Sequence, residues 1–166
     1  MNNYDSREDT LEHIFKVRHN IAVILQKISE RSYVHDASKL EDPEKSTFDK
    51  VTPRLKGLTY GSDEYKASLV TMQGALDHHY ANNRHHPEHF EDGIKGMTLV
   101  DLIEMFCDWC AATERHADGD IFKSIKINKE RFQYGDVLEA IFKNTASRLD
   151  MGKKGETYEN SPDQSK

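Results

Sequence analysis

The stretch from Leu99 to Ala112 most constrains the fold, because it is almost wholly apolar apart from three acids. Thr98 and Asp101 have the spacing of a capping box, which predicts that a helix begins here. A helix that is apolar on most sides belongs in a protein interior. Asp101, Glu104 and Asp108 follow the spacing i, i+3, i+7 and therefore share one face of this helix. Buried carboxylates are costly, so each needs a cation, a positive side chain or a helix cap.

Apolar residues recur at helical spacing along most of the chain, and no convincing strand or internal repeat appears. The pattern predicts an all-α fold. A long amphipathic helix is expected from Asp5 to about Glu30, with Ser6 and Asp9 as a capping box. A short helix opens at Asp42-Pro43 and ends before Thr52-Pro53. The remaining expected helices are 62–79, which Ser62 can cap and whose apolar stripe ends at His79, then 121–132 and 137–149.

Length and charge narrow the possible classes of protein. The chain has 166 residues, which fits one domain, and we expect it over residues 1–149. Residues 150–166 have too little apolar content to pack and are expected to form a flexible tail. The net charge is −6 and the basic residues are scattered, so nucleic acid is not an expected partner. No apolar stretch approaches the roughly 20 residues of a membrane span, and we expect a cytoplasmic protein without a membrane partner.

Five of the nine histidines fall within one window of twelve residues: His78, His79, His85, His86 and His89. His79 continues the apolar stripe of its helix, whereas His78 is rotated from it by about 100°. A lone histidine at that place is usually a hydrogen-bonded core residue. The loop RHHPEH that follows favours a cluster of metal ligands instead, with His79 facing inward.

Candidate ligands also occur near both ends of the first helix. His13 is about 70° from the centre of its apolar stripe and can face an interior, whereas His19 lies nearly opposite the stripe. His35 and Asp36 are adjacent, and both can reach one cation only if the backbone between them is held at a helix start or a kink. Imidazole and carboxylate together favour Mn, Fe, Co, Ni or Zn over Ca or Mg. Such mixed sites are more often those of hydrolases than structural zinc sites.

The three acids of the apolar helix have alternative explanations. Asp101 has a structural role available as the partner of Thr98, and this interpretation is favoured for it. An ion pair with Arg115 could satisfy Asp108, although metal ligation is the favoured interpretation there. For Glu104 the two interpretations are nearly balanced.

Three motifs in order resemble the H…HD…D pattern of HD-domain phosphohydrolases: His13 in HIFKV, His35-Asp36 with Lys39 in HDASK, and Asp108 in EMFCDW. The run ALDHHYANNRHHPEHF is similar to the insertion that supplies a second metal in the binuclear HD subgroup, although its histidine pairs are closer together than in HD-GYP phosphodiesterases. The runs HDASKLEDPE, TPRLKGLTYGSDEYK and DLIEMFCDWCAA are similar to a family of uncharacterised phage and bacterial proteins held to be HD-like. The resemblance implies an HD-like bundle of about six to seven helices, in the host cytoplasm if the protein is phage-encoded.

The resemblance also implies a ligand set. The first metal would be held by His13, His35, Asp36 and Asp108. His79 with His85 or His86 would complete this site or add a second ion, so one or two divalent transition-metal ions are expected.

Roles in catalysis and substrate binding follow from the same resemblance. Asp36 and Lys39 are expected to act in catalysis, with Lys39 contacting a phosphate. Glu104 or Glu88 could assist proton transfer. Candidates for substrate binding, with solvated surface residues as the alternative interpretation, are Arg84, Lys56, Tyr60, Asn82 and Arg115.

The expected reaction is hydrolysis of a small phosphorylated substrate, such as a nucleotide or deoxynucleotide, by metal-activated water. Two other classes fit the same ligands. One is a di-iron oxygenase of the inositol-oxygenase type. The other is a metal-bound or nucleotide-binding protein without catalysis. The sequence leaves open whether the chain forms a homo-oligomer.

Overall fold

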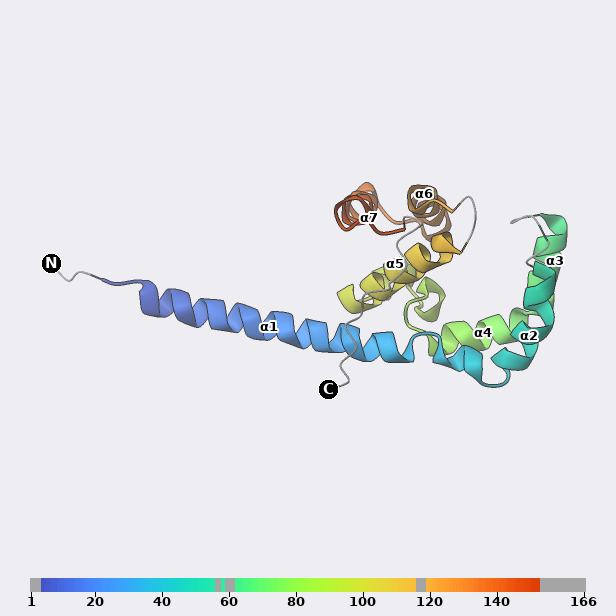
Figure 1. Cartoon of the computed structure of the whole chain (residues 1–166), viewed down its shortest axis with the longest axis horizontal. Helices are drawn as coiled ribbons and strands as arrows, with labels where there is room; N and C mark the ends of the chain where they lie inside the picture. The colour runs from blue at the N-terminus through green and yellow to red at the C-terminus, as the bar shows by residue number, and fades with distance from the viewer. Residues whose placement is uncertain (1–3, 56–57, 59–61, 116–118, 153–166) are drawn as a thin grey trace, which may run out of the picture. The chain divides into compact units, whose positions relative to one another are not determined.

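The computed structural model describes residues 4–55, 58, 62–115 and 119–152, and these residues form helices and no β-strand. The predicted all-α class is therefore confirmed. The α-helices are α1 (Arg7–Val34), α2 (Glu44–Leu55), α3 (Asp63–Thr71), α4 (Gln73–Asn82), α5 (Leu99–Glu114), α6 (Ile121–Phe132) and α7 (Asp136–Arg148), and short 3-10 helices are η1 (Ala37–Leu40), η2 (Pro87–His89) and η3 (Gly93–Gly96) (Figure 1). Among these helices, none is long and apolar enough to cross a membrane.

The chain divides into two compact units, Met1–Glu104 and Met105–Lys166, with the boundary inside α5. The single domain expected over residues 1–149 stays a prediction. The tail expected over residues 150–166 lies outside the described residues from residue 153 onward.

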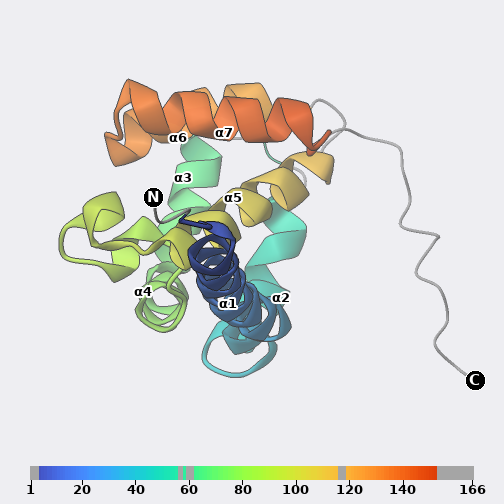
Figure 2. The same ribbon diagram turned by 90° about the vertical axis from the view of Figure 1, so that its left-hand side faces the viewer.

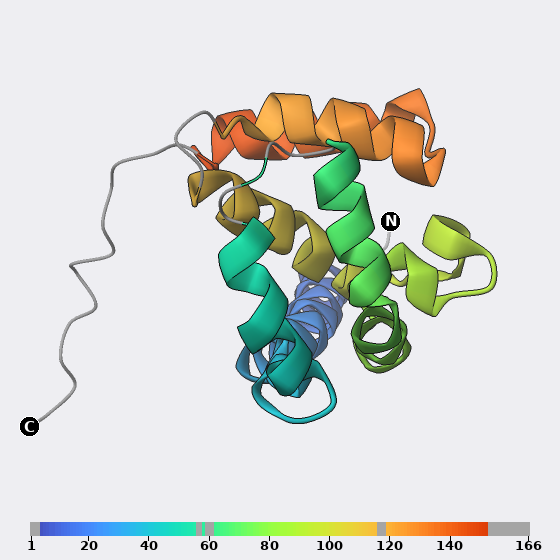
Figure 3. The same cartoon turned by 90° about the vertical axis from the view of Figure 1, so that its right-hand side faces the viewer.

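In the first unit, short helices gather at the C-terminal end of α1. There α2 packs against η1 and α4, and α3 contacts both α2 and α4 (Figure 3). Val51, Met72 and Ala75 provide buried apolar side chains among these helices. Asn83 Nδ2 donates a hydrogen bond of 2.7 Å to Ser38 Oγ, which ties the end of α4 to η1. This packing brings the segment after α1 beside the histidine-rich segment.

Two helix boundaries and one helix cap in the first unit differ from those expected. The helix expected over 62–79 is interrupted at Met72, which is buried and followed after one residue by Gly74, a poor helix former. Helix α2 continues through Pro53 to Leu55 instead of ending before Thr52. The Ser6 side chain makes no cap hydrogen bond to α1.

The start of α5 matches its predicted capping box. The backbone N–H of Thr98 donates to Asp101 Oδ2 at 2.9 Å, and the backbone N–H of Asp101 donates to Thr98 Oγ1 at 3.3 Å. The structural role favoured for Asp101 from the sequence is thus confirmed.

In the second unit, α6 and α7 lie side by side (Figures 1 and 2). Asp120 caps α6 by accepting a hydrogen bond of 2.8 Å from the Phe122 backbone N–H. Phe142 of α7 stacks on Phe106 at a centroid distance of 5.2 Å and meets Trp109 edge-on at 5.5 Å. Both predicted helices of this segment are confirmed within about one residue.

Candidate metal centre

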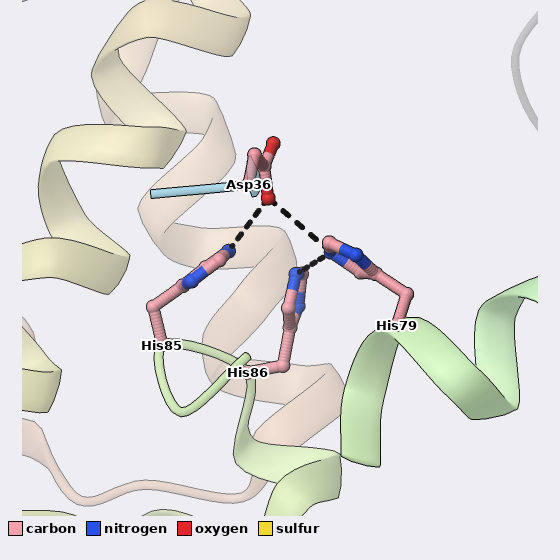
Figure 4. Close-up of side chains that lie close together, drawn as sticks. All are labelled: Asp36, His79, His85 and His86. Carbon is pink, nitrogen blue, oxygen red and sulfur yellow. Dashed lines mark hydrogen bonds and ion pairs between the residues drawn. The ribbon is translucent and has the colours of Figure 1, made fainter. Parts of the chain in front are cut away.

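Asp36 lies at a sharp turn directly after α1. The helix ends at Val34, and Asp36 has φ 56° and ψ 13°, which is the left-handed region. Aspartate enters this region more readily than most residues, and such conformations concentrate at functional sites. The kink required by the sequence argument for His35 and Asp36 is therefore present. It directs Oδ1 of Asp36 toward His79 of α4 and His85 of the loop that follows α4 (Figure 4).

Three imidazoles converge on this carboxylate, and with Asp36 they form the histidine–aspartate cluster: His79, His85 and His86 (Figure 4). Nε2 of His79 lies 3.4 Å from Asp36 Oδ1, and Nε2 of His85 lies 3.5 Å from the same oxygen. Nε2 of His86 is 2.9 Å from Nε2 of His79. His79 comes from α4, whereas His85 and His86 come from the loop before η2.

These spacings fit a shared cation. Two ligand atoms bound at about 2.1 Å from one ion lie about 3.0 Å apart at an octahedral angle and about 3.4 Å apart at a tetrahedral angle. Asp36 Oδ1 and His85 Nε2 are both buried, and neither forms a hydrogen bond within the described chain. Buried polar atoms of this kind call for a partner. The donor set, three imidazoles and one carboxylate, suits a divalent transition metal.

Carboxylates stand behind two of the imidazoles. Glu44, whose side chain is fully buried, places Oε2 at 2.9 Å from Nδ1 of His79. Glu104 Oε1 lies 3.2 Å from Nδ1 of His85. A carboxylate at one ring nitrogen keeps the proton there and leaves the lone pair of the other nitrogen available to a metal. The Nε2 atoms of His79 and His85, on the far side of each ring from its carboxylate, both face Asp36.

The charge states in the cluster also favour cation binding. Burial lowers the pKa of His79, and the Lys39 charge lowers it further, so the ring is neutral near pH 7. Burial alone would raise the pKa of Asp36, but the hydrogen bond and charge of Lys39 outweigh it and hold this pKa below its ordinary value. A neutral imidazole and an ionised carboxylate are the forms that ligate a metal.

Glu104 belongs to a charged network behind the cluster. Arg31 Nη2 forms an ion pair with Glu104, and Arg31 Nη1 donates to Asp101 Oδ1 at 2.8 Å. His35 Nδ1 lies 2.9 Å from Glu104 Oε1. Burial opposes ionisation of Glu104, yet the hydrogen bonds from His35 and His85 and the Arg31 charge lower its pKa to about 2. The network fixes Glu104 as a permanent anion at the back of His85.

Several predicted residues are placed in this unit. Asp36 and His79 come together with both of the histidines expected as alternatives, His85 and His86, and His35 joins through Glu104. His13 does not join them. It is exposed on α1, 22 residues before His35, which is about 33 Å along a helix. A helical wheel shows which face a residue occupies but not what covers that face.

Of the predicted substrate-binding residues, Lys39 contacts Asp36 of the cluster, whereas Arg84 and Asn82 have other partners in the first unit. Arg84 donates to both oxygens of Asp101, at 3.2 and 3.1 Å. Asn82 is exposed and donates to the backbone oxygen of His78. Arg115 is exposed and belongs to the second unit, as does Asp108, whose ligand role stays a prediction. Lys56 and Tyr60 lie outside the described residues.

Comparisons with known proteins give a family and no activity. The family model "Family of unknown function (DUF5662)" matches residues 2–150. The chain belongs to this family. No curated protein and no solved structure matches the chain. Nothing in these comparisons links DUF5662 to the HD-domain superfamily, so the resemblance to HD phosphohydrolases stays a hypothesis.

One residue of the site in this DUF5662 chain, Glu44, is not among those expected from the sequence. Glu44 follows a proline at the start of α2 and looks like an acid of a first helical turn. A signal was nevertheless present, because Glu44 precedes Phe48 by four residues and Val51 by seven. These positions share one helix face, and an acid in line with apolar residues points to a buried partner.

Proposed function

We propose that this protein is a metal-dependent phosphohydrolase that acts on a small phosphorylated substrate, with nucleotides and deoxynucleotides as the first class to test. The observation that carries the proposal is the convergence of Asp36 Oδ1 with His79, His85 and His86, behind which stand the carboxylates of Glu44 and Glu104. Mn, Fe, Co, Ni and Zn are the candidate ions. When bound, such an ion supplies hydroxide near neutral pH and offsets charge on phosphoryl oxygens.

Lys39 is the residue that we assign to the phosphate. Its Nζ lies 2.5 Å from Asp36 Oδ2, whereas His79 and His85 lie against the other carboxylate oxygen, Oδ1. The two oxygens of Asp36 thus have separate partners, with Oδ1 toward the cluster and Oδ2 toward the ammonium. The Lys39 side chain is about one-third exposed, so a phosphate oxygen arriving from solvent can meet it.

The sequence suggests Glu104 as a group that assists proton transfer, but we propose a different role for it. An acid whose pKa is lowered to about 2 is a weak base near pH 7. Its contact with His85 and its ion pair with Arg31 favour a positioning role. We therefore assign Glu104 to the orientation of His85.

Two measurements on one set of proteins test the proposal. Metal content is determined on the purified wild type, on His85→Ala and on Lys39→Met, with Lys45→Met as a control at an exposed ion pair of α2. Phosphate release is then followed with a panel of nucleotides in the presence of Mn, Co, Ni or Mg. We expect Lys39→Met to keep its metal and lose phosphate release, whereas Lys45→Met keeps both. Metal-free wild-type protein under all conditions would overturn the proposal.

The same proteins separate the two other classes that fit these ligands. Bound iron with oxygen uptake and no phosphate release would indicate an oxygenase. Tight nucleotide binding without turnover under every metal would indicate a binding protein. A phosphohydrolase must be in the compartment that contains its substrates. Because small soluble nucleotides are cytoplasmic metabolites, we propose that the protein is cytoplasmic.

A further inference from the structure

Helix α1 has a long apolar surface that no residue of its own unit, Met1–Glu104, buries. None of its 28 residues is buried. Large apolar side chains exposed along it are Leu11, Ile14, Phe15, Val17, Ile21, Val23, Ile24 and Leu25. Scattered single apolar residues are normal on a protein surface, but a continuous row of them marks an interaction site.

Five β-branched residues in this row have heptad spacing. Ile14, Val17, Ile21, Ile24 and Ile28 follow one another at intervals of three, four, three and four, and they are called the seam below. The first four are between 38% and 52% exposed, and Ile28 is half-buried. Apolar residues at alternating intervals of three and four form the contact stripe of paired helices. The row is therefore built to pack against another helix.

We propose that the seam pairs with the seam of a second copy of this chain, with the two α1 helices antiparallel. The charge on α1 is asymmetric along its length. Residues 7–12 carry three acids and one base, a net charge of −2, whereas residues 13–34 carry four bases and one acid, Glu30, a net charge of +3. A parallel pair sets like charges side by side. An antiparallel pair brings the acidic end of each helix to the basic end of the other and also opposes the two helix dipoles.

The ends of the seam define the register. The next heptad position after Ile28 is Arg31, but its guanidinium is held by Asp101 and Glu104 inside its own unit. The contact therefore ends at Ile28, which faces Thr10 of the other helix. In this register Ile14 faces Ile24 of the second copy, and Val17 faces Ile21. A helix of 28 residues is about 42 Å long, which accommodates all of these layers.

The first test measures mass in solution, and it does not depend on the proposed reaction. The chain has a mass of 19.2 kDa, and sedimentation equilibrium of the wild type should give twice this value. Ile21→Glu places a charge in the middle of the seam and should return the protein to the monomer mass. The control is His19→Glu, an exposed position outside the seam, which should remain dimeric. Circular dichroism confirms that both variants keep their helix content.

The second test determines direction by disulfide cross-linking in a Cys107→Ser background. The proposed register brings Ile14→Cys in one copy beside Ile24→Cys in the other, so a mixture of the two proteins should form a mixed disulfide. Ile14→Cys alone should not cross-link to itself, because the two positions are about 15 Å apart along the helices. Self-cross-linking of Ile14→Cys would overturn the antiparallel arrangement.

A monomeric wild type would overturn the proposal, whatever then covers the seam. In that case, the rate at which a reagent labels the thiol of Ile21→Cys shows whether another part of the same chain covers the seam. Slow labelling of this thiol in a monomer would mean that the chain covers its own seam, and fast labelling would mean that the seam is bare in the isolated protein.

Discussion

Glu44 Oε2 lies 2.9 Å from Nδ1 of His79, and both side chains are almost completely buried. The other oxygen of Glu44 is 2.7 Å from Nδ1 of His78. One carboxylate thus holds two neighbouring imidazoles from a helix that lies beside its own. These contacts lower the pKa of Glu44 although burial opposes its ionisation, so it is a stable anion near pH 7.

Replacement of Glu44 should weaken metal binding without removing a ligand. Glu44→Gln keeps the shape of the side chain but loses the charge that fixes the proton on His79 Nδ1. We expect affinity for Zn or Mn to fall about 10–100-fold, as is usual for the carboxylate behind a ligating histidine. Competition with a chromophoric chelator measures this affinity, with the exposed Glu41→Gln as control. Unchanged affinity in Glu44→Gln would remove Glu44 from the site.

Two histidines should respond in opposite ways to replacement. His85→Ala removes a buried ligand atom and should abolish metal binding at stoichiometric concentrations. His13→Ala should retain the full metal content, because His13 is exposed far along α1. Elemental analysis after gel filtration compares the two. Loss of metal in His13→Ala would favour the ligand set of the HD resemblance over the cluster described by the structure.

Asp101 should contribute to stability in a pH-dependent manner. Its pKa lies below the ordinary value because Arg84, Thr98 and Arg31 outweigh the cost of burial. A lowered pKa in the folded state gives stability that is present above the unfolded pKa of about 4 and is lost as the pH falls further. At pH 7, Asp101→Asn should lower the free energy of unfolding by about 3 kcal/mol.

Urea unfolding of metal-free protein at a series of pH values measures this contribution. The difference between wild type and Asp101→Asn should shrink as the pH is lowered from 5 toward 3. Asp92→Asn, at an exposed position of the same unit, should unfold like the wild type. A difference that stays constant with pH would mean that the ion pairs of Asp101 do not stabilise the fold.

The aromatic core of the second unit should affect stability and not metal binding. Phe142 is buried and contacts Phe106, Trp109 and Tyr134. Phe142→Ala should lower the free energy of unfolding by about 3–5 kcal/mol. The protein that remains folded should keep its metal, since the cluster residues all belong to the first unit. Folded but metal-free Phe142→Ala would contradict this expectation.

Those parts of the cluster that depend on local sequence patterns could be predicted. His79 continues an apolar stripe, and it is buried as that pattern requires. The need for a kink between His35 and Asp36 follows from side-chain reach, and the left-handed backbone at Asp36 provides it.

Other features depend on packing that no local pattern contains. Glu44 and His79 meet because α2 packs against α4, and their positions in the sequence are 35 residues apart. The break at Met72 likewise separates α3 from α4 within a segment whose apolar spacing is continuous. The expectation for His13 failed for a different reason. A helical wheel gives the angle of a residue around the helix axis, but it does not give the distance of that residue along the axis.

The position of Asp36 has a further consequence for heat stability. Three ligands of the cluster fall between residues 79 and 86, whereas Asp36 lies 43 residues before the first of them. A bound ion would thus form a reversible cross-link between the end of α1 and the histidine-rich loop. Because a ligand that binds only the folded state shifts the unfolding equilibrium, the melting temperature should rise with metal concentration and fall with a chelator. Melting curves would then report occupancy of the centre before any substrate is known.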